Sequence, residues 1–190
     1  MPVPFFGNRF AKQKVPVPFC LLLPLPLLMP TVYIESSIIS YLRQRPSADI
    51  LTAARQLLTT RWWAMGRSAY ELVISQYVLD EIAAGDSTLA ADRLLAVEGI
   101  PILPPAPEIP QIASAIMSQA ILPAKAEVDA LHIAAVAHHR INYLLTWNCS
   151  HIAKAKILPR IYSVLRAWHL PIPIICTPEE LLGDDSSTDA

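Results

Sequence analysis

Short apolar runs that alternate with helical patterns restrict the fold of this chain more than any other feature. The runs fall at 32–34, 71–75, 100–103, 143–146 and 172–176, and longer segments with apolar residues at helical spacing separate them. Strands that are joined through helices form parallel sheets whose two faces the helices cover. The alternation therefore predicts an α/β fold, a three-layer α/β/α sandwich with a mostly parallel sheet of about five strands.

The helical segments have recognisable beginnings and ends. Ser36 or Ser37 is suited to cap the first helix, and the segment 46–49 opens the second. Further helices are predicted over 78–84, 88–97, 109–122, 125–139 and 153–168, the last with a bend or break at Pro159.

The ends of the chain differ from its centre in composition. Residues 1–28 carry six prolines and three basic residues with no acid, which predicts a dispensable, disordered extension with Met29 as the start of the working protein. An export signal is the alternative, although prolines interrupt its apolar run and no small-x-small cleavage site follows. The segment 183–190 is predicted to be an acidic tail, and 29–182 is the predicted single domain.

Charge and cysteine content limit the partners and the compartment. Residues 29–190 hold twelve basic and sixteen acidic residues, so the predicted domain has no global basic surface for nucleic acid. The densest basic stretch contains Lys154, Lys156, Arg160 and Arg166, which could contact phosphates or form a solvated helix face. Three scattered cysteines fit a reducing, cytoplasmic location, and no segment is long and continuous enough to span a membrane.

Four polar residues stand where predicted strands meet predicted helices. Glu35 follows the first strand, Glu81 lies on the short helix after the second, Asp129 lies near the start of the helix 125–139, and Asn148 follows the strand 143–146. Because ligands bind outside the carboxyl ends of parallel strands, the topology allows all four side chains to converge. Oxygen ligands of this kind suit a hard divalent cation.

Each of these residues also has a purely structural interpretation. Glu35 and Glu81 could be helix-terminus or solvated acids, and Asn148 could cap the next helix. Asp129 is harder to explain in that way, because the residues around it are almost all apolar and a buried acid needs a partner. Beside Glu81, Asp80 is better placed as a solvated first-turn acid.

Other constellations are weaker. His132 lies one turn after Asp129 and could orient it or a phosphate, although a core role is the commoner one for such a histidine. No cysteine or histidine spacing indicates zinc. An acid-nucleophile phosphatase would need Asp-x-Asp after the first strand, where this chain has Glu35-Ser36-Ser37.

Three segments resemble the signature segments of PIN-domain proteins, in particular VapC-like toxins of prokaryotic toxin–antitoxin modules. They are the segments 33–42, 129–134 and 144–148. The resemblance implies an α/β/α sandwich that binds Mg²⁺ or Mn²⁺ through acidic residues and cleaves RNA. It places Glu35, Glu81 and Asp129 as metal ligands, and these three with Asn148 as the catalytic set.

The resemblance also implies partners: an RNA substrate, a cognate antitoxin and a second copy of the chain. Apolar residues at Ile38, Ile39, Leu42 and the Trp62-Trp63 pair could form such contacts, or could equally belong to the core. Two departures from the family pattern stand out, since Glu35 and Asn148 occupy positions that are usually aspartate. A catalytically weak or inactive PIN-fold binding module is therefore the alternative function.

Overall fold

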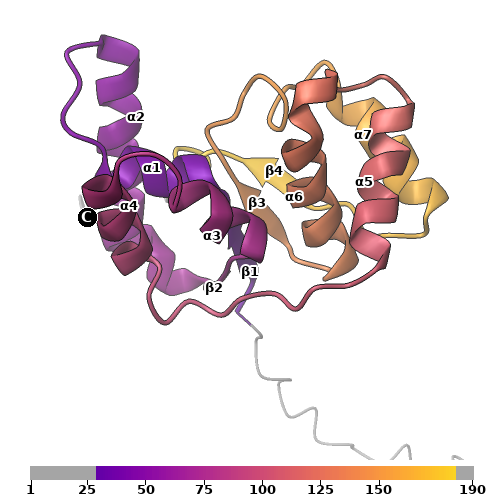
Figure 1. Ribbon diagram of the computed structural model, residues 1–190, viewed down its shortest axis with the longest axis horizontal. Helices are drawn as coiled ribbons and strands as arrows, with labels where there is room; N and C mark the ends of the chain where they lie inside the picture. Colours follow the sequence, from indigo (N-terminus) through magenta and orange to yellow (C-terminus); the bar gives the residue numbers. More distant parts are fainter. Residues whose placement is uncertain (1–28, 183–190) are drawn as a thin grey trace, which may run out of the picture.

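The computed structural model describes residues 29–182. The predictions of a disordered extension over 1–28 and an acidic tail over 183–190 lie outside the described residues. Within the described residues, a four-stranded sheet is flanked by seven α-helices. Figure 1 shows the strands between a group formed by α1 to α4 and a group formed by α5 to α7.

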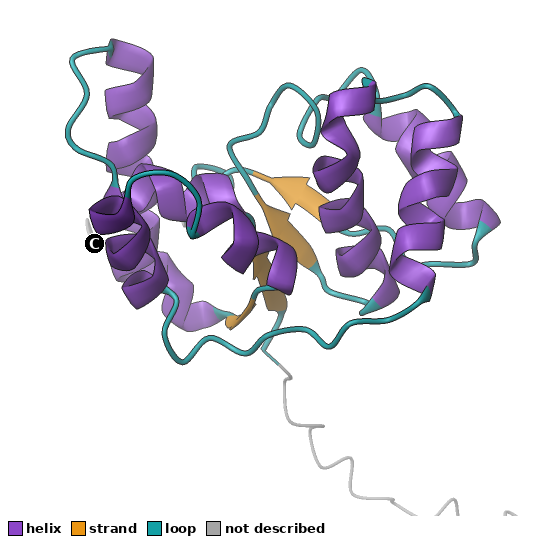
Figure 2. Ribbon diagram, viewed as in Figure 1, coloured by secondary structure: helices purple, strands orange, loops and turns teal. Residues whose placement is uncertain are grey.

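The sheet is entirely parallel, with strand order β2-β1-β3-β4. Its strands are β1 (Thr31–Ile34), β2 (Glu71–Val73), β3 (Tyr143–Leu145) and β4 (Ile174–Cys176). They are short compared with the helices and loops around them (Figure 2). Val32, Tyr33 and Ile34 have no exposed surface, as expected for a central strand covered on both faces.

The prediction of about five strands was wrong by one. The segment 100–103 contributes only an isolated parallel bridge between Ile74 and Ile102 in the described structure. Pro101 has no N–H to donate to a ladder, so its carbonyl accepts from Ile74 while the chain runs past the sheet edge. This segment lies next to β2 without extending the sheet.

The first four helices are α1 (Ser36–Arg43), α2 (Ile50–Arg61), α3 (Gln76–Ile82) and α4 (Ser87–Ala96). The Asp49 side chain accepts from the N–H of Thr52, which caps α2 as predicted from the segment 46–49. A π-helical turn, Trp62–Gly66, and a 3₁₀ turn, Arg67–Ala69, lead from α2 into β2.

The remaining helices are α5 (Glu108–Ser118), α6 (Glu127–His138), preceded by a 3₁₀ turn at Ala124–Ala126, and α7 (Leu158–Ala167). The prediction of a helix over 153–168 was wrong for 153–157, because α7 begins only at Leu158. Pro159 stands in the first turn of α7, where its missing N–H costs nothing, so the helix starts at this proline and does not run through it.

The core explains the apolar residues that could also have formed an interface. Ile38, Ile39 and Trp62 have no exposed surface, and Trp63 packs against the same core. α6 is the most enclosed helix, with seven consecutive or near-consecutive buried positions from Ala130 to Ala137, and this agrees with its nearly continuous apolar sequence.

Candidate metal and catalytic centre

The candidate site lies at the topological switch point of the sheet. From β1 the chain crosses to β2 on one side and later returns to β3 on the other, so the carboxyl ends of β1 and β3 are neighbours. The N–H of Glu35, just past β1, donates to the carbonyl of Leu145 over 3.1 Å. In open α/β sheets this is the place where ligands bind.

Glu35 is a buried carboxylate held by three hydroxyl groups. It is 3% exposed. Ser36 Oγ donates to its Oε1 over 2.8 Å, and both Ser37 Oγ and Thr146 Oγ1 donate to its Oε2, the latter over 2.6 Å. The prediction that Ser36 or Ser37 caps the first helix was wrong, because both hydroxyls serve Glu35 instead. Thr146 comes from the end of β3, so the clamp joins the two strand ends.

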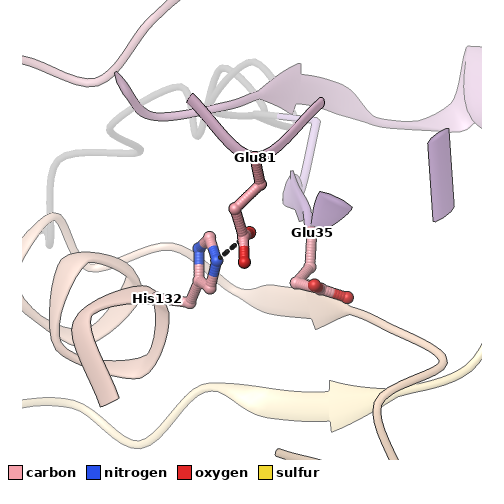
Figure 3. A group of neighbouring side chains, drawn as sticks. All are labelled: Glu35, Glu81 and His132. Atoms are coloured by element: carbon pink, nitrogen blue, oxygen red, sulfur yellow. Dashed lines mark hydrogen bonds and ion pairs between the residues drawn. The ribbon is translucent and has the colours of Figure 1, made fainter. Parts of the chain in front are cut away.

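Glu81 ends a buried chain of hydrogen bonds. Its Oε2 lies 2.8 Å from His132 Nε2 (Figure 3), and His132 Nδ1 lies 2.7 Å from the hydroxyl of Tyr33. That hydroxyl also lies 2.6 Å from Ser75 Oγ. With Nε2 of His132 donating to Glu81, every polar group in the chain from Ser75 through Tyr33 to His132 has a hydrogen-bond partner.

Burial and the chain of hydrogen bonds affect which of these groups carry a charge. His132 has no exposed surface, and burial keeps the pKa of the Tyr33 hydroxyl far above its usual range, so the hydroxyl stays protonated. Burial also acts to raise the pKa of Glu81, but hydrogen bonding and charge from His132 outweigh it and the net direction is downward. Glu81 is therefore an anion whose orientation depends on His132.

Asp129, in the first turn of α6, forms a second arrangement with the loop after β3. Asn148 Nδ2 donates to its Oδ1 over 2.8 Å, and His151 Nδ1 lies 2.9 Å from its Oδ2. Burial raises the pKa of Asp129 above its usual value, and the nearby negative charge of Glu35 adds to this, although His151 acts in the opposite direction. The surroundings of Asp129 therefore favour its protonated form more than water does.

The structure brings the predicted residues together in two adjoining groups. One ligand atom from each of Glu35, Glu81 and His132 lies within 4.8 Å of the others. Asp129 and Asn148 make up the second group, and Thr146 Oγ1 joins it to the first, because it donates to Glu35 and accepts from the N–H of Asn148. The predicted metal ligands therefore share one edge of the sheet.

The donor set suits a hard cation. A carboxylate offers about four acceptor positions, and Glu35 uses three, Asp129 two and Glu81 one in the hydrogen bonds described above. The remaining oxygen lone pairs belong to three carboxyl groups, and oxygen is the ligand atom that Mg²⁺ and Mn²⁺ prefer. Both nitrogens of His132 are already engaged, so it acts on Glu81 rather than as a free ligand.

Asn148 has a different geometry from the three acids. Its amide NH₂ donates to Asp129, and its Oδ1 accepts from the N–H of His151 over 3.0 Å. Its own N–H donates to Thr146 Oγ1. The residue caps the turn that follows β3, and its NH₂ group donates to Asp129 at the same time.

Sequence reasoning missed two contributors and misassigned a third. His151 was passed over, although Asn148 begins a turn that brings a residue three positions later back to the site. Tyr33 gave no signal, because an aromatic residue in a central strand reads as core. His132 was expected beside Asp129, but its hydrogen bonds go to Glu81 and Tyr33.

Comparison with known proteins gives similarity in structure. No protein-family model matches the chain, and no curated protein matches it. In structure the chain is similar to VapC20 of Mycobacterium tuberculosis, described as a sarcin-ricin loop cleaving toxin, at 15% sequence identity and a TM-score of 0.49. The match covers 65% of this chain and 95% of VapC20. The similarity is one of fold, to a VapC toxin, and it carries no activity with it.

Proposed function

We propose that this protein is a metal-dependent endoribonuclease that hydrolyses RNA phosphodiester bonds and is the toxin of a toxin–antitoxin pair. One observation carries the proposal: carboxylates from three separate elements lie at the switch point of a parallel sheet. Glu35 after β1 has an oxygen within 4.8 Å of one from Glu81 on α3, and Thr146 and Asn148 link Glu35 by hydrogen bonds to Asp129 on α6. Burying acids near one another is unfavourable unless something positive shares them. Resemblance of the segments 33–42, 129–134 and 144–148 to VapC-like PIN proteins supports RNA as substrate.

Glu35, Glu81 and Asp129 would hold the ion, which is Mg²⁺ or Mn²⁺. When bound, such an ion lowers the pKa of a coordinated water and offsets charge on a phosphate. The chain's own residues prepare that site. Ser36, Ser37 and Thr146 fix the Glu35 carboxylate, and burial of that carboxylate at 3% exposure keeps bulk water from competing for it.

Asn148 and His151 prepare the other side of the site. Together they hold both oxygens of Asp129 in place, which leaves one lone pair on each oxygen free for a ligand or an attacking water. The partners in this proposal are an RNA substrate, a cognate antitoxin protein and a second copy of the chain, in the cytoplasm. No described helix combines the length and the apolar character that crossing a membrane requires.

The experiment is cleavage of a structured RNA with Mg²⁺ or Mn²⁺ by the full chain and its Asp129→Asn variant. Asparagine keeps the shape and one acceptor oxygen for Asn148 but removes the anion, so activity should fall at least about 100-fold, the upper range for loss of a mere supporting residue. Glu127→Gln is the matched control, because Glu127 is an exposed acid two residues earlier on α6. Equal metal-dependent cleavage by wild type and the Asp129 variant would refute this site.

A non-catalytic binding module is the second candidate, and the hydrogen bonding of two residues favours it. Glu35 is already satisfied by three hydroxyls, and Asn148 supplies an amide that both donates and accepts within the protein. Calorimetric titration of the full chain with Mn²⁺ separates the two functions. Millimolar binding that Asp129→Asn abolishes supports the nuclease, whereas no binding supports the module.

A further inference from the structure

A pocket of about 340 Å³ opens beside the candidate site, on the side of Asp129. His151 belongs to both, since it lines the pocket and its Nδ1 contacts the Asp129 carboxylate. The pocket is bounded by the loop after β3, by the segment 121–123 between α5 and α6, and by Ile157 before α7. Its volume lies within the range of small-ligand sites.

The pocket combines an apolar wall with a polar rim. Ile121, Leu122 and Pro123 supply the wall, on which a flat ring could stack. The rim carries Lys154 and Ser150, both exposed. The Lys154 side chain makes no hydrogen bond or ion pair with any of the described residues, so its ammonium group can meet an anion.

A second depression continues from the first. It has a volume of about 300 Å³, lies between α5 and α7, and shares Ile121 with the first pocket, which is called the Lys154 pocket below. Arg160 lines it, with Nη2 donating to the carbonyl of Gln119 over 2.7 Å, which fixes the guanidinium and leaves its other donors available. Apolar surface with a cation therefore occurs twice in succession, leading away from the carboxylates.

Charge complementarity identifies the occupant. Glu35, Glu81 and Asp129 repel a polyanion, so a nucleic-acid strand that approaches them needs cations on the flank of the site. The Lys154 pocket supplies such a cation, and His151 connects the pocket to Asp129. The pocket also has an apolar wall that a charged backbone alone would not need. A nucleotide, with its flat base and its phosphate, uses both features.

We infer that the Lys154 pocket, lined by the segment 121–123, His151 and Lys154, binds a nucleotide of single-stranded RNA adjacent to the cleaved bond. The inference rests on the proposed nuclease function for its orientation, but its binding step is separable from cleavage. Ile121 and Leu122 receive the base, Lys154 pairs with a phosphate, and Arg160 meets the strand further along.

Fluorescence anisotropy with a labelled single-stranded RNA oligonucleotide in EDTA tests the binding step, because EDTA removes the metal and so prevents cleavage. Lys154→Gln should weaken binding several-fold and reduce the slope of log affinity against log salt by about 0.7, as for one lost phosphate contact on a single strand. Lys156→Gln is the matched control, since Lys156 is an exposed lysine two residues away that does not line the pocket. It should bind as wild type does.

Thiol reactivity gives a second measurement at the same place. Cys149 lines the pocket and is exposed, whereas Cys176 is buried. In a Cys20→Ser background, saturating oligonucleotide should slow the reaction of Cys149 with a thiol reagent several-fold. Both results together support a nucleotide in the pocket rather than a general attraction to lysine.

The outcomes separate this inference from the proposed function. Any of three results would overturn the proposed pocket. RNA does not bind the wild type, RNA binds both lysine variants equally, or bound RNA leaves Cys149 unprotected. Metal-dependent cleavage by Lys154→Gln with an unchanged KM also overturns it and leaves the nuclease intact. Lys154-dependent binding without any cleavage supports the pocket and refutes the nuclease.

Discussion

At the scale of single residues, each candidate carboxylate differs in the donors that surround it. Glu35 has three hydroxyl donors, Glu81 has one histidine, and Asp129 has an amide and a histidine. Their positions along the chain indicated where acids would stand but not which donors would meet them. Those donors come from residues far away in sequence, and Thr146 lies 111 positions from Glu35.

Tyr33→Phe tests whether the buried chain orients Glu81. The change removes only the hydroxyl that joins Ser75 to His132, and leaving buried groups unpaired should cost about 1–3 kcal/mol of stability. With His132 less fixed, Mn²⁺ affinity measured by calorimetry should fall about 10- to 100-fold, as for other supporting residues of metal sites.

Tyr77→Phe is the control for that change. The Tyr77 ring packs edge-on against His132, and its hydroxyl makes no hydrogen bond with the described residues. It should keep the Mn²⁺ affinity of wild type. Unaltered affinity in Tyr33→Phe would show that Glu81 needs no positioning through His132.

At the scale of secondary-structure elements, backbone hydrogen bonding decided what periodicity alone could not. The segment 100–103 has an apolar strand pattern but only one bridge to the sheet. The segment 153–157 has helical composition, yet the N–H groups of Ile152 and Ala153 both donate to the carbonyl of Asn148 and close a turn instead. That turn carries His151 to the site, so a failed helix prediction coincides with a functional feature.

The π-helical turn Trp62–Gly66 depends on a glycine. A Cβ atom at Gly66 would lie 2.7 Å from Cδ1 of the fully buried Trp62 ring, closer than packed atoms tolerate. Gly66→Ala should therefore lower the free energy of unfolding by about 1–3 kcal/mol, the cost of an overpacked core, as measured by chemical denaturation.

Ser68→Ala is the companion variant for Gly66→Ala. Ser68 is exposed in the 3₁₀ turn that follows, and its change should stay within about 0.5 kcal/mol of wild type. If Gly66→Ala is as stable as Ser68→Ala, the contact between Gly66 and Trp62 does not restrict this turn.

At the scale of the whole molecule, clustering of anions at one sheet edge couples stability to pH and metal. Asp129 has a raised pKa in the folded protein, so the folded protein binds a proton at this carboxyl more tightly than the unfolded chain does. Without metal, this carboxyl contributes stability at low pH that is lost as pH rises from the usual aspartate range through its folded pKa. Glu81, with its lowered pKa, contributes in the opposite direction.

Mn²⁺ should reverse the loss that Asp129 causes. At a concentration 100 times its Kd the ion should add about 2.7 kcal/mol to the free energy of unfolding. The gain should appear as pH rises through the folded pKa of Asp129, because protons compete with the metal below it. Differential scanning calorimetry over a pH series measures it.

Asp129→Asn serves as the comparison in the same series. It should lose the metal-dependent gain and be less sensitive to pH in this range without metal. A melting temperature of wild type that does not respond to Mn²⁺ at any pH would contradict a carboxylate metal site.

The sequence by itself determined the fold class, the parallel sheet and the strand-edge positions of Glu35, Glu81, Asp129 and Asn148, because alternating strand and helix patterns leave few ways to bury apolar surface. Only the tertiary structure decided that the sheet has four strands, that His132 serves Glu81, and that His151 connects Asp129 to a pocket that Lys154 also lines. The physical reason is the distance along the sequence over which each interaction acts. Periodicity records which residues a local element buries, whereas hydrogen-bond partners and pockets arise between segments that meet only after the chain has folded.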